Sequence, residues 1–106
     1  MIFKSLTEQG KMSERDIERI FVRTVKEAGG IALKFVSPGF DGMPDRIVLM
    51  PGGRIGFVEV KDTGKKPRPL QVARHRLLAG LGFRVFVLDR QEQIPDIILT
   101  IGGEAK

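Results

Sequence analysis

The sequence feature that most constrains the fold is a pair of strand-like segments separated by two glycines. Residues Asp45–Met50 and Ile55–Lys61 are rich in isoleucine, valine and other apolar side chains that favour strands. The connection between them, Pro51-Gly52-Gly53-Arg54, is short and contains glycine, as turns between antiparallel strands commonly do. We therefore predict a β-hairpin over residues 45–61.

Helix and strand patterns surround this hairpin. Apolar residues recur at helical spacing after Ser13, which forms a capping box with Asp16, and Gly29-Gly30 ends the pattern. Pro69 suits the first turn of a second helix. The predicted elements are a helix over residues 13–28, strands at 31–36, 45–50 and 55–61, a helix at 69–79, a strand at 83–88, and a short helix or edge element at 94–101. The order αβββαβ indicates an α/β fold.

The second predicted helix has a stripe of apolar residues that we expect to be buried. These residues are Leu70, Ala73, Leu77 and Leu81. His75 lies four residues after Gln71, and we predict it on the outer side of this helix. The segments outside the periodic patterns, residues 1–12 and 102–106, are expected to be a loosely ordered lead-in and a flexible C-terminus.

Length and composition limit the possible chemistry. The 106 residues suffice for one compact domain, and an apolar fraction of 42% gives a core of modest size, so that dimerisation would add stability. The chain has no cysteine and a single histidine, which excludes disulfides, thiolate metal sites, cysteine nucleophiles and histidine-rich zinc sites. A bound metal must therefore be held by oxygen atoms, which favours Mg²⁺ or Mn²⁺.

The charge of the chain indicates the class of partner. The formal net charge is +5, which favours a polyanion through phosphate neutralisation and counterion release, although many small basic proteins bind nothing specific. No segment approaches the roughly 18 apolar residues of a membrane span. The N-terminus lacks the apolar core of a signal peptide. We therefore expect a cytoplasmic protein without a membrane partner.

Three charged residues of the predicted hairpin are the candidates for catalysis. Glu59 and Lys61 are two positions apart on one strand, so their side chains share a face, where charge is costly beside apolar neighbours. Counting back from the turn places Asp45 opposite residues 59–61. A two-residue turn at Gly52-Gly53 would pair Asp45 with Val60 and put it on the other face. We therefore predict an odd-length loop or a bulge.

Two carboxylates and an ammonium group in one place can support phosphodiester hydrolysis. Asp45 and Glu59, with the backbone carbonyl of Val60, would hold a divalent cation that polarises a scissile phosphate and lowers the pKa of a bound water. Lys61 would position or deprotonate that water, or stabilise the leaving charge. The alternative is a structural cluster of ion pairs on a surface strand.

The motifs around these residues resemble those of a nuclease family. Pro44-Asp45 and, after thirteen intervening residues, Glu59-Val60-Lys61 resemble the PD-(D/E)XK signature. The surrounding segments resemble the VRR-NUC family, especially its stand-alone phage and bacterial members, over residues 13–94. These segments are Lys34–Gly39, Gly42–Arg46, Phe57–Lys61, Pro67–Gln71 and Gly82–Val85.

The resemblance implies an α/β restriction-endonuclease-like fold, with a mixed sheet flanked by helices, in one nuclease domain over residues 13–101. It implies a homodimer that hydrolyses DNA with Mg²⁺ or Mn²⁺ and cuts branched DNA such as four-way junctions, in a bacterial or phage-infected cell. The family has an acidic residue on the first helix. Glu14, near the inward-facing stripe, is favoured over Glu18 at its edge. Gln71 matches the family's second-helix glutamine, which would reach the metal-bound water or a phosphate.

Further polar residues are candidates for contacts with DNA. Ser37 and Arg46 match family positions and would contact backbone phosphate, although Ser37 could instead cap its own loop. The absence of tryptophan and tyrosine argues against a stacking platform for single strands, so duplex or branched DNA is the expected substrate. A basic run beside the proposed site would follow the DNA backbone. Its residues are Lys65, Lys66, Arg68, Arg74 and Arg76.

Two other classes of function remain open from the sequence. A non-catalytic nucleic-acid-binding module would keep the basic run, but would have no need of Asp45, Glu59 and Lys61 together. A structural or antitoxin-like partner protein would bind neither metal nor DNA.

Overall fold

A four-stranded mixed sheet forms the centre of the structure. The computed structural model describes residues 11–102, so most of the predicted lead-in and C-terminus lies outside the described residues. The elements are α2 (Glu14–Glu27), β1 (Ile31–Lys34), β2 (Arg46–Met50), β3 (Arg54–Val60), α3 (Pro69–Gly80), β4 (Arg84–Leu88), a short 3₁₀ helix η1 (Gln91–Gln93) and α4 (Ile94–Gly102). The segment at 94–101, whose type the sequence left open, is a helix.

The strands lie in the order β1-β2-β3-β4. The first three are antiparallel neighbours, whereas β4 is parallel to β3. A parallel neighbour requires a crossover connection, which α3 provides. The predicted mixed sheet and the α/β fold class are therefore confirmed.

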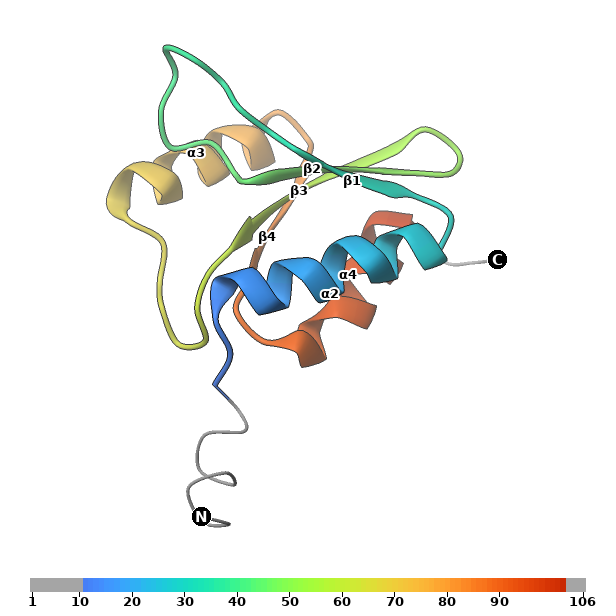
Figure 1. Ribbon diagram of the computed structural model, residues 1–106. Helices are drawn as coiled ribbons and strands as arrows, with labels where there is room; N and C mark the ends of the chain where they lie inside the picture. The colour runs from blue at the N-terminus through green and yellow to red at the C-terminus, as the bar shows by residue number, and fades with distance from the viewer. Residues whose placement is uncertain (1–10, 103–106) are drawn as a thin grey trace, which may run out of the picture.

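Helices cover both faces of the sheet (Figure 1). On one face, α2 and α4 form the main hydrophobic core, in which Ile17, Phe21 and Val25 of α2 are fully buried. Close approach of α4 depends on Gly56, because a Cβ at this position would lie 2.5 Å from Cδ1 of Ile101. The other face is covered by α3. Within residues 11–102, no helix is long and apolar enough to cross a membrane.

The start of α2 agrees with the capping prediction. The Ser13 side chain accepts a hydrogen bond from the backbone N–H of Asp16 at 3.1 Å, which satisfies one free donor of the first turn.

The hairpin between β2 and β3 has a three-residue loop. Met50 pairs with Arg54, so Pro51, Gly52 and Gly53 form the turn. Both glycines have positive φ, at 86° and 74°, a conformation that glycine adopts without steric cost. The prediction of an odd-length loop is therefore confirmed.

The buried side of α3 differs from the prediction. Leu70, Leu77 and Leu81 are 46%, 44% and 66% exposed, whereas Gln71 and Leu78 are buried. The predicted apolar stripe was wrong because α3 packs over a carboxylate of β3 as well as over apolar residues, so its sheet-facing side includes polar groups.

Candidate active site

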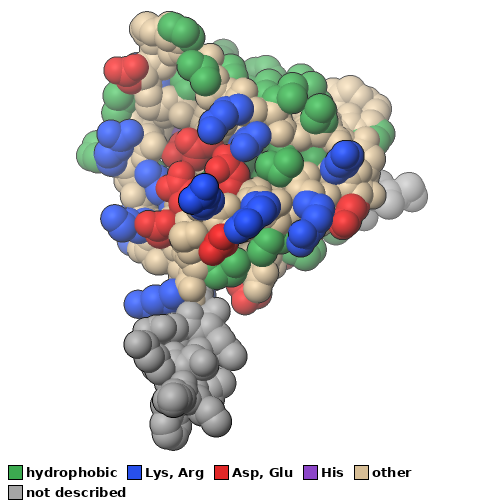
Figure 2. All heavy atoms as spheres, viewed as in Figure 1, with side chains coloured by type: hydrophobic (Ala, Val, Ile, Leu, Met, Phe, Trp, Pro, Cys, Tyr) green, Lys and Arg blue, Asp and Glu red, His purple; other side chains and the backbone are tan. Residues whose placement is uncertain are grey.

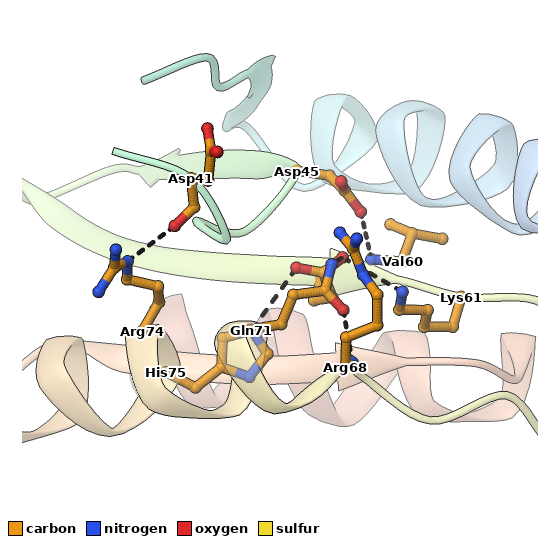
Figure 3. A network of polar contacts seen from close by, with 9 residues as sticks. Asp41, Asp45, Val60, Lys61, Arg68, Gln71, Arg74 and His75 are labelled. Atoms are coloured by element: carbon orange, nitrogen blue, oxygen red, sulfur yellow. Dashed lines mark hydrogen bonds and ion pairs between the residues drawn. The ribbon is translucent and has the colours of Figure 1, made fainter. Parts of the chain in front are cut away.

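The register of the hairpin brings Asp45 to Glu59. Arg46 pairs with Val58, and continuing this register by one residue places Asp45 opposite Glu59 on the face covered by α3. Oδ2 of Asp45 accepts a hydrogen bond from the backbone N–H of Val60 at 2.8 Å. This bond closes the end of the β2–β3 pair and fixes the first carboxylate beside the second (Figure 3).

Lys61, the residue directly after β3, lies beside the two carboxylates. Its backbone N–H donates to the carbonyl of Leu88 at 2.9 Å, which keeps the chain in the sheet and the side chain on the face of Glu59. Nζ of Lys61 lies 3.9 Å from Oε2 of Glu59. The structure thus brings together Asp45, Glu59 and Lys61.

Glu59 is 1% exposed, an unusual environment for a carboxyl group. Gln71, itself 6% exposed, donates from Nε2 to Oε2 of Glu59 at 2.8 Å, and its Oε1 accepts the backbone N–H of Arg68 at 2.8 Å. Gln71 therefore links the start of α3 to the carboxylate and fixes the orientation of Glu59.

His75 lies on the inner side of α3, so its prediction as a surface residue was wrong. Its side chain is 14% exposed, and Nε2 is 3.5 Å from Oε1 of Glu59. Residues four apart on a helix share a face, and the hydrogen bond of Gln71 to Glu59 defines which face that is. In Figure 3, Gln71 and His75 both extend from α3 toward β3.

Two buried polar atoms of this cluster lack a hydrogen-bond partner among the described residues. They are Oε1 of Glu59 and Nε2 of His75. Buried polar atoms are rarely left unsatisfied in folded proteins, and at functional sites they commonly indicate room for an ion, a water or a substrate group. These two atoms face each other across 3.5 Å, so the oxygen of Glu59 that is free to accept a ligand lies beside His75.

Burial and neighbouring charge shift the ionisation of the cluster. Burial, followed by the charge of Asp45 and a hydrogen bond shared with it, raises the pKa of Glu59 to about 8, against the lowering effect of Lys61. In the absence of metal, Glu59 therefore holds a proton at neutral pH, and its contact with Lys61 is not a full ion pair. Burial lowers the pKa of His75, which favours the neutral imidazole.

The N-terminus of α2 is attached to the loop that follows Lys61. Oδ1 of Asp62 accepts the backbone N–H of Glu14 at 2.6 Å, and Met12 and Thr63 exchange two further hydrogen bonds. Sequence reasoning missed Asp62 and Thr63. The available signal was an acid directly after Lys61, since carboxylates bind the free N–H groups of helix N-termini.

Glu14 and Glu18, the two candidate acids of α2, have different surroundings. Glu14 is exposed, yet burial and the charge of Asp45 raise its pKa, with a smaller opposing effect from Lys61. Oε2 of Glu18 instead accepts a hydrogen bond from Nε of Arg46 at 2.7 Å. Glu14 thus lies within electrostatic reach of the cluster, whereas Glu18 is engaged in an ion pair.

Known proteins resemble this chain in sequence and in fold. No protein-family model matches the sequence. A protein named "Putative nuclease p44", from Acyrthosiphon pisum secondary endosymbiont phage 1, is 52% identical over 79 residues, which are 74% of this chain and 85% of the relative. A solved structure described as a VRR_NUC domain has a TM-score of 0.77 and 30% identity, and the match covers 82% of this chain and 96% of the other. The chain belongs to the VRR-NUC family.

The VRR-NUC site offers oxygen atoms of the kind that hard divalent cations prefer. Within residues 11–102, no group of three His, Cys, Asp or Glu side chains is arranged to hold a metal by itself. Two carboxylates, Asp45 and Glu59, stand side by side, and Oε1 of Glu59 is unsatisfied. Mg²⁺ commonly retains several waters and binds through one or two carboxylates, so the residues present fit such an ion.

The predicted DNA contacts of this VRR-NUC chain fall into two groups. Lys65, Lys66 and Arg68 are exposed in the connection between β3 and α3. By contrast, Nε of Arg74 donates to the carbonyl of Asp41 at 2.7 Å and its guanidinium lies 3.8 Å from the ring centre of Phe40.

Arg46 and Ser37 also have structural contacts. Arg46 faces α2, where it binds Glu18 and donates to the carbonyl of Ala32 at 3.2 Å. Ser37 lies in a turn in which its carbonyl accepts the N–H of Phe40 at 3.1 Å.

Proposed function

We propose that this VRR-NUC chain is a Mg²⁺- or Mn²⁺-dependent DNA endonuclease with Asp45, Glu59 and Lys61 at its active centre. The observation that carries the proposal is the buried carboxyl group of Glu59, which lies opposite Asp45 with one oxygen unsatisfied. Gln71 and Lys61 contact its other oxygen, Oε2, but burial of the ionised form is costly unless both oxygens are paired. A divalent cation would pair with Oε1.

In the proposed mechanism, Asp45 and Glu59 would hold the cation together with the backbone carbonyl of Val60. When bound, the cation would polarise the scissile phosphate and lower the pKa of the attacking water. Gln71 holds the Glu59 carboxyl group in place through its 2.8 Å hydrogen bond. Lys61 would orient the water or neutralise charge that develops on the phosphate in the transition state.

Lys65, Lys66 and Arg68 are proposed to contact the DNA backbone next to this centre, because they are exposed in the loop that leads from Lys61 to α3. Ser37, Arg46 and Arg74 remain candidates for such contacts. Arg46 and Arg74 already use part of their hydrogen-bonding capacity within the protein.

The preferred substrate is proposed to be branched DNA, such as a four-way junction, cut by a homodimer with two active sites. Exposed apolar side chains support a partner surface: Ile31, Leu33 and Ile55 are half-exposed on the sheet face that α3 leaves open. The proposed location is the cytoplasm of a bacterial or phage-infected cell, where both DNA and Mg²⁺ are available.

The direct test is cleavage of linear, flap and four-way-junction DNA by the purified chain, with and without Mg²⁺ or Mn²⁺. We expect cleavage only with a divalent cation, fastest on the junction, complete loss with chelator and recovery when the cation is restored. Asp45→Asn is the matched inactive control, because it keeps the shape of the site and removes one charged ligand. Cleavage of no substrate, or cleavage that survives chelation, would contradict the proposal.

Glu14 and Glu18, the two candidate acids of α2, provide a second test. Glu14→Gln should lower Mn²⁺ affinity and cleavage by roughly tenfold, because Glu14 lies within electrostatic reach of Asp45 and would act on the metal or its water. Glu18→Gln is the matched control. It should lower the free energy of unfolding by about 1 kcal/mol through loss of its Arg46 partner, with cleavage changed less than twofold. Equal cleavage by the two variants would remove Glu14 from the site.

A further inference from the structure

A row of basic side chains runs along the outer face of α2. Arg15, Arg19, Arg23 and Lys26 are exposed, and with Arg46 they line a shallow hollow of about 460 Å³. We call these four residues of α2 the basic face. In Figure 2, Lys and Arg side chains gather over α2, beside a cluster of acidic side chains near the helix N-terminus.

The basic face follows from the periodicity of α2. Its residues are three or four positions apart, so they lie on one side of the helix, and Ile17, Phe21 and Val25 are fully buried on the other. Among the described residues near it, Asp16 pairs with Arg19 and Glu18 pairs with Arg46. α2 also carries Glu14 and Glu27, so the helix as a whole has four acids and four cations. The positive charge is local: within residues 11–102, Arg15, Arg23 and Lys26 have no ion pair, whereas Arg19 and Arg46 each have one.

The basic face is continuous with the candidate active site. Glu14, the first residue of α2, lies within electrostatic reach of Asp45 and Lys61, and Arg15 follows it directly. Asp45 turns toward Glu59 on one face of the sheet and Arg46 turns toward α2 on the other, so the site and the basic face adjoin at the end of the sheet where α2 begins. A duplex that reaches the site must pass this end of the sheet to continue along α2.

A divalent cation in the site would be balanced by the carboxylates of Asp45 and Glu59, so attraction for a phosphate backbone must come largely from basic side chains outside the site. Lys65, Lys66 and Arg68 offer such charge in the loop after Lys61, and the basic face offers it along α2. We propose that the basic face of α2 binds the phosphate backbone of the duplex arm that extends from the cleaved bond. This inference rests on the proposed function.

The dimensions and composition of the face favour duplex DNA. From Arg15 to Lys26 the helix rises about 16 Å, along which one DNA strand presents about five phosphates. A membrane surface fits less well, because an interfacial helix needs an apolar face to insert, and the apolar face of α2 is buried in the core. No aromatic side chain lines the hollow, so stacking of single-stranded bases is not favoured.

The test measures binding to a 30-base-pair duplex and to a four-way junction as a function of salt, in an Asp45→Asn background that permits binding without cleavage. Arg19→Gln combined with Arg23→Gln should weaken binding by at least about tenfold at 0.1 M salt and reduce the slope of log affinity against log salt by about 1.8, the value for two lost phosphate contacts. The control is Arg84→Gln, which removes an exposed arginine from β4, at the edge of the sheet farthest from β1. This control should keep both the affinity and the slope.

The outcomes separate the inference from the proposed function. If the unmodified chain cuts DNA with metal but the α2 variant binds DNA with unchanged affinity and slope, the inference is overturned and the nuclease proposal stands. Equal losses in the α2 variant and the control would show a non-specific charge effect and also overturn it. Loss of binding to anionic phosphatidylserine vesicles, with DNA binding retained, would assign the face to membranes instead. If the unmodified chain neither binds nor cuts DNA, the proposed function itself fails.

Discussion

Lys61→Ala should lower the rate of DNA cleavage by roughly 10²- to 10⁴-fold, the usual contribution of a positioned acid–base or charge-stabilising group. Nζ of Lys61 lies 3.9 Å from Oε2 of Glu59, and the side chain is only 17% exposed. Its ammonium group is therefore held beside the carboxyl group of Glu59. DNA affinity should change less than about twofold, because one cation beside several carboxylates contributes little to binding a polyanion.

Single-turnover cleavage and equilibrium binding, measured on the same four-way junction, distinguish the two effects. Lys34→Ala is a matched control, since it removes an exposed lysine from β1 of the same sheet and should keep both activities. A Lys61→Ala variant that cuts at more than a tenth of the normal rate would exclude Lys61 from the chemistry. Loss of binding without loss of the chemical step would instead indicate a role in holding DNA.

The stability of the metal-free protein should fall by about 1.5 kcal/mol between pH 6.5 and pH 8. Glu59, with its pKa raised from 4.5 to about 8, keeps a proton in the folded state that the unfolded chain has already lost. The folded state therefore binds more protons than the unfolded state over this range, and its stability decreases as pH rises, by up to about 1.4 kcal/mol per pH unit. The contribution of Glu59 to the free energy of unfolding is complete below pH 4.5 and is lost as the pH rises through about 8.

Denaturant unfolding with a chelator at several pH values measures this slope. Glu59→Gln should flatten it, because glutamine resembles the protonated carboxyl group and does not titrate, whereas Glu92→Gln, at an exposed position, should leave it unchanged. Added Mg²⁺ should stabilise the protein more at pH 8 than at pH 6.5, since the cation binds the ionised carboxylate. A slope that persists in Glu59→Gln would assign the titration to another group.

The sequence was sufficient for the features that depend on local periodicity. Alternation along residues 55–61 placed Glu59 and Lys61 on one face. The cap at Ser13 and the order of helices and strands also follow from short segments of chain, because the residues involved are close together in sequence. The odd-length loop was predicted from the requirement that Asp45 meet Glu59 or Lys61, since the two glycines alone suggest a two-residue turn.

The environment of α3 depends on contacts across the fold and was not predictable in the same way. An apolar stripe through Leu77 and Leu81 satisfied helical spacing, but the helix turns Gln71 and His75 toward the sheet because Glu59 is buried beneath them. The attachment of α2 through Asp62 and Thr63 joins residues about fifty positions apart. Neither arrangement has a signal within a window of single helix or strand length.

The same long-range contacts have a consequence for synthesis of the chain on the ribosome. Asp45, Glu59 and Lys61 emerge before Gln71, which fixes the Glu59 carboxyl group, and before Leu88, whose carbonyl holds Lys61 in the sheet. A nascent or truncated chain that ends before β4 therefore contains the charged residues without the arrangement that orients them. Assembly of the proposed active site waits until almost the whole domain has been made, so we expect incomplete translation products to leave the DNA of the producing cell uncut.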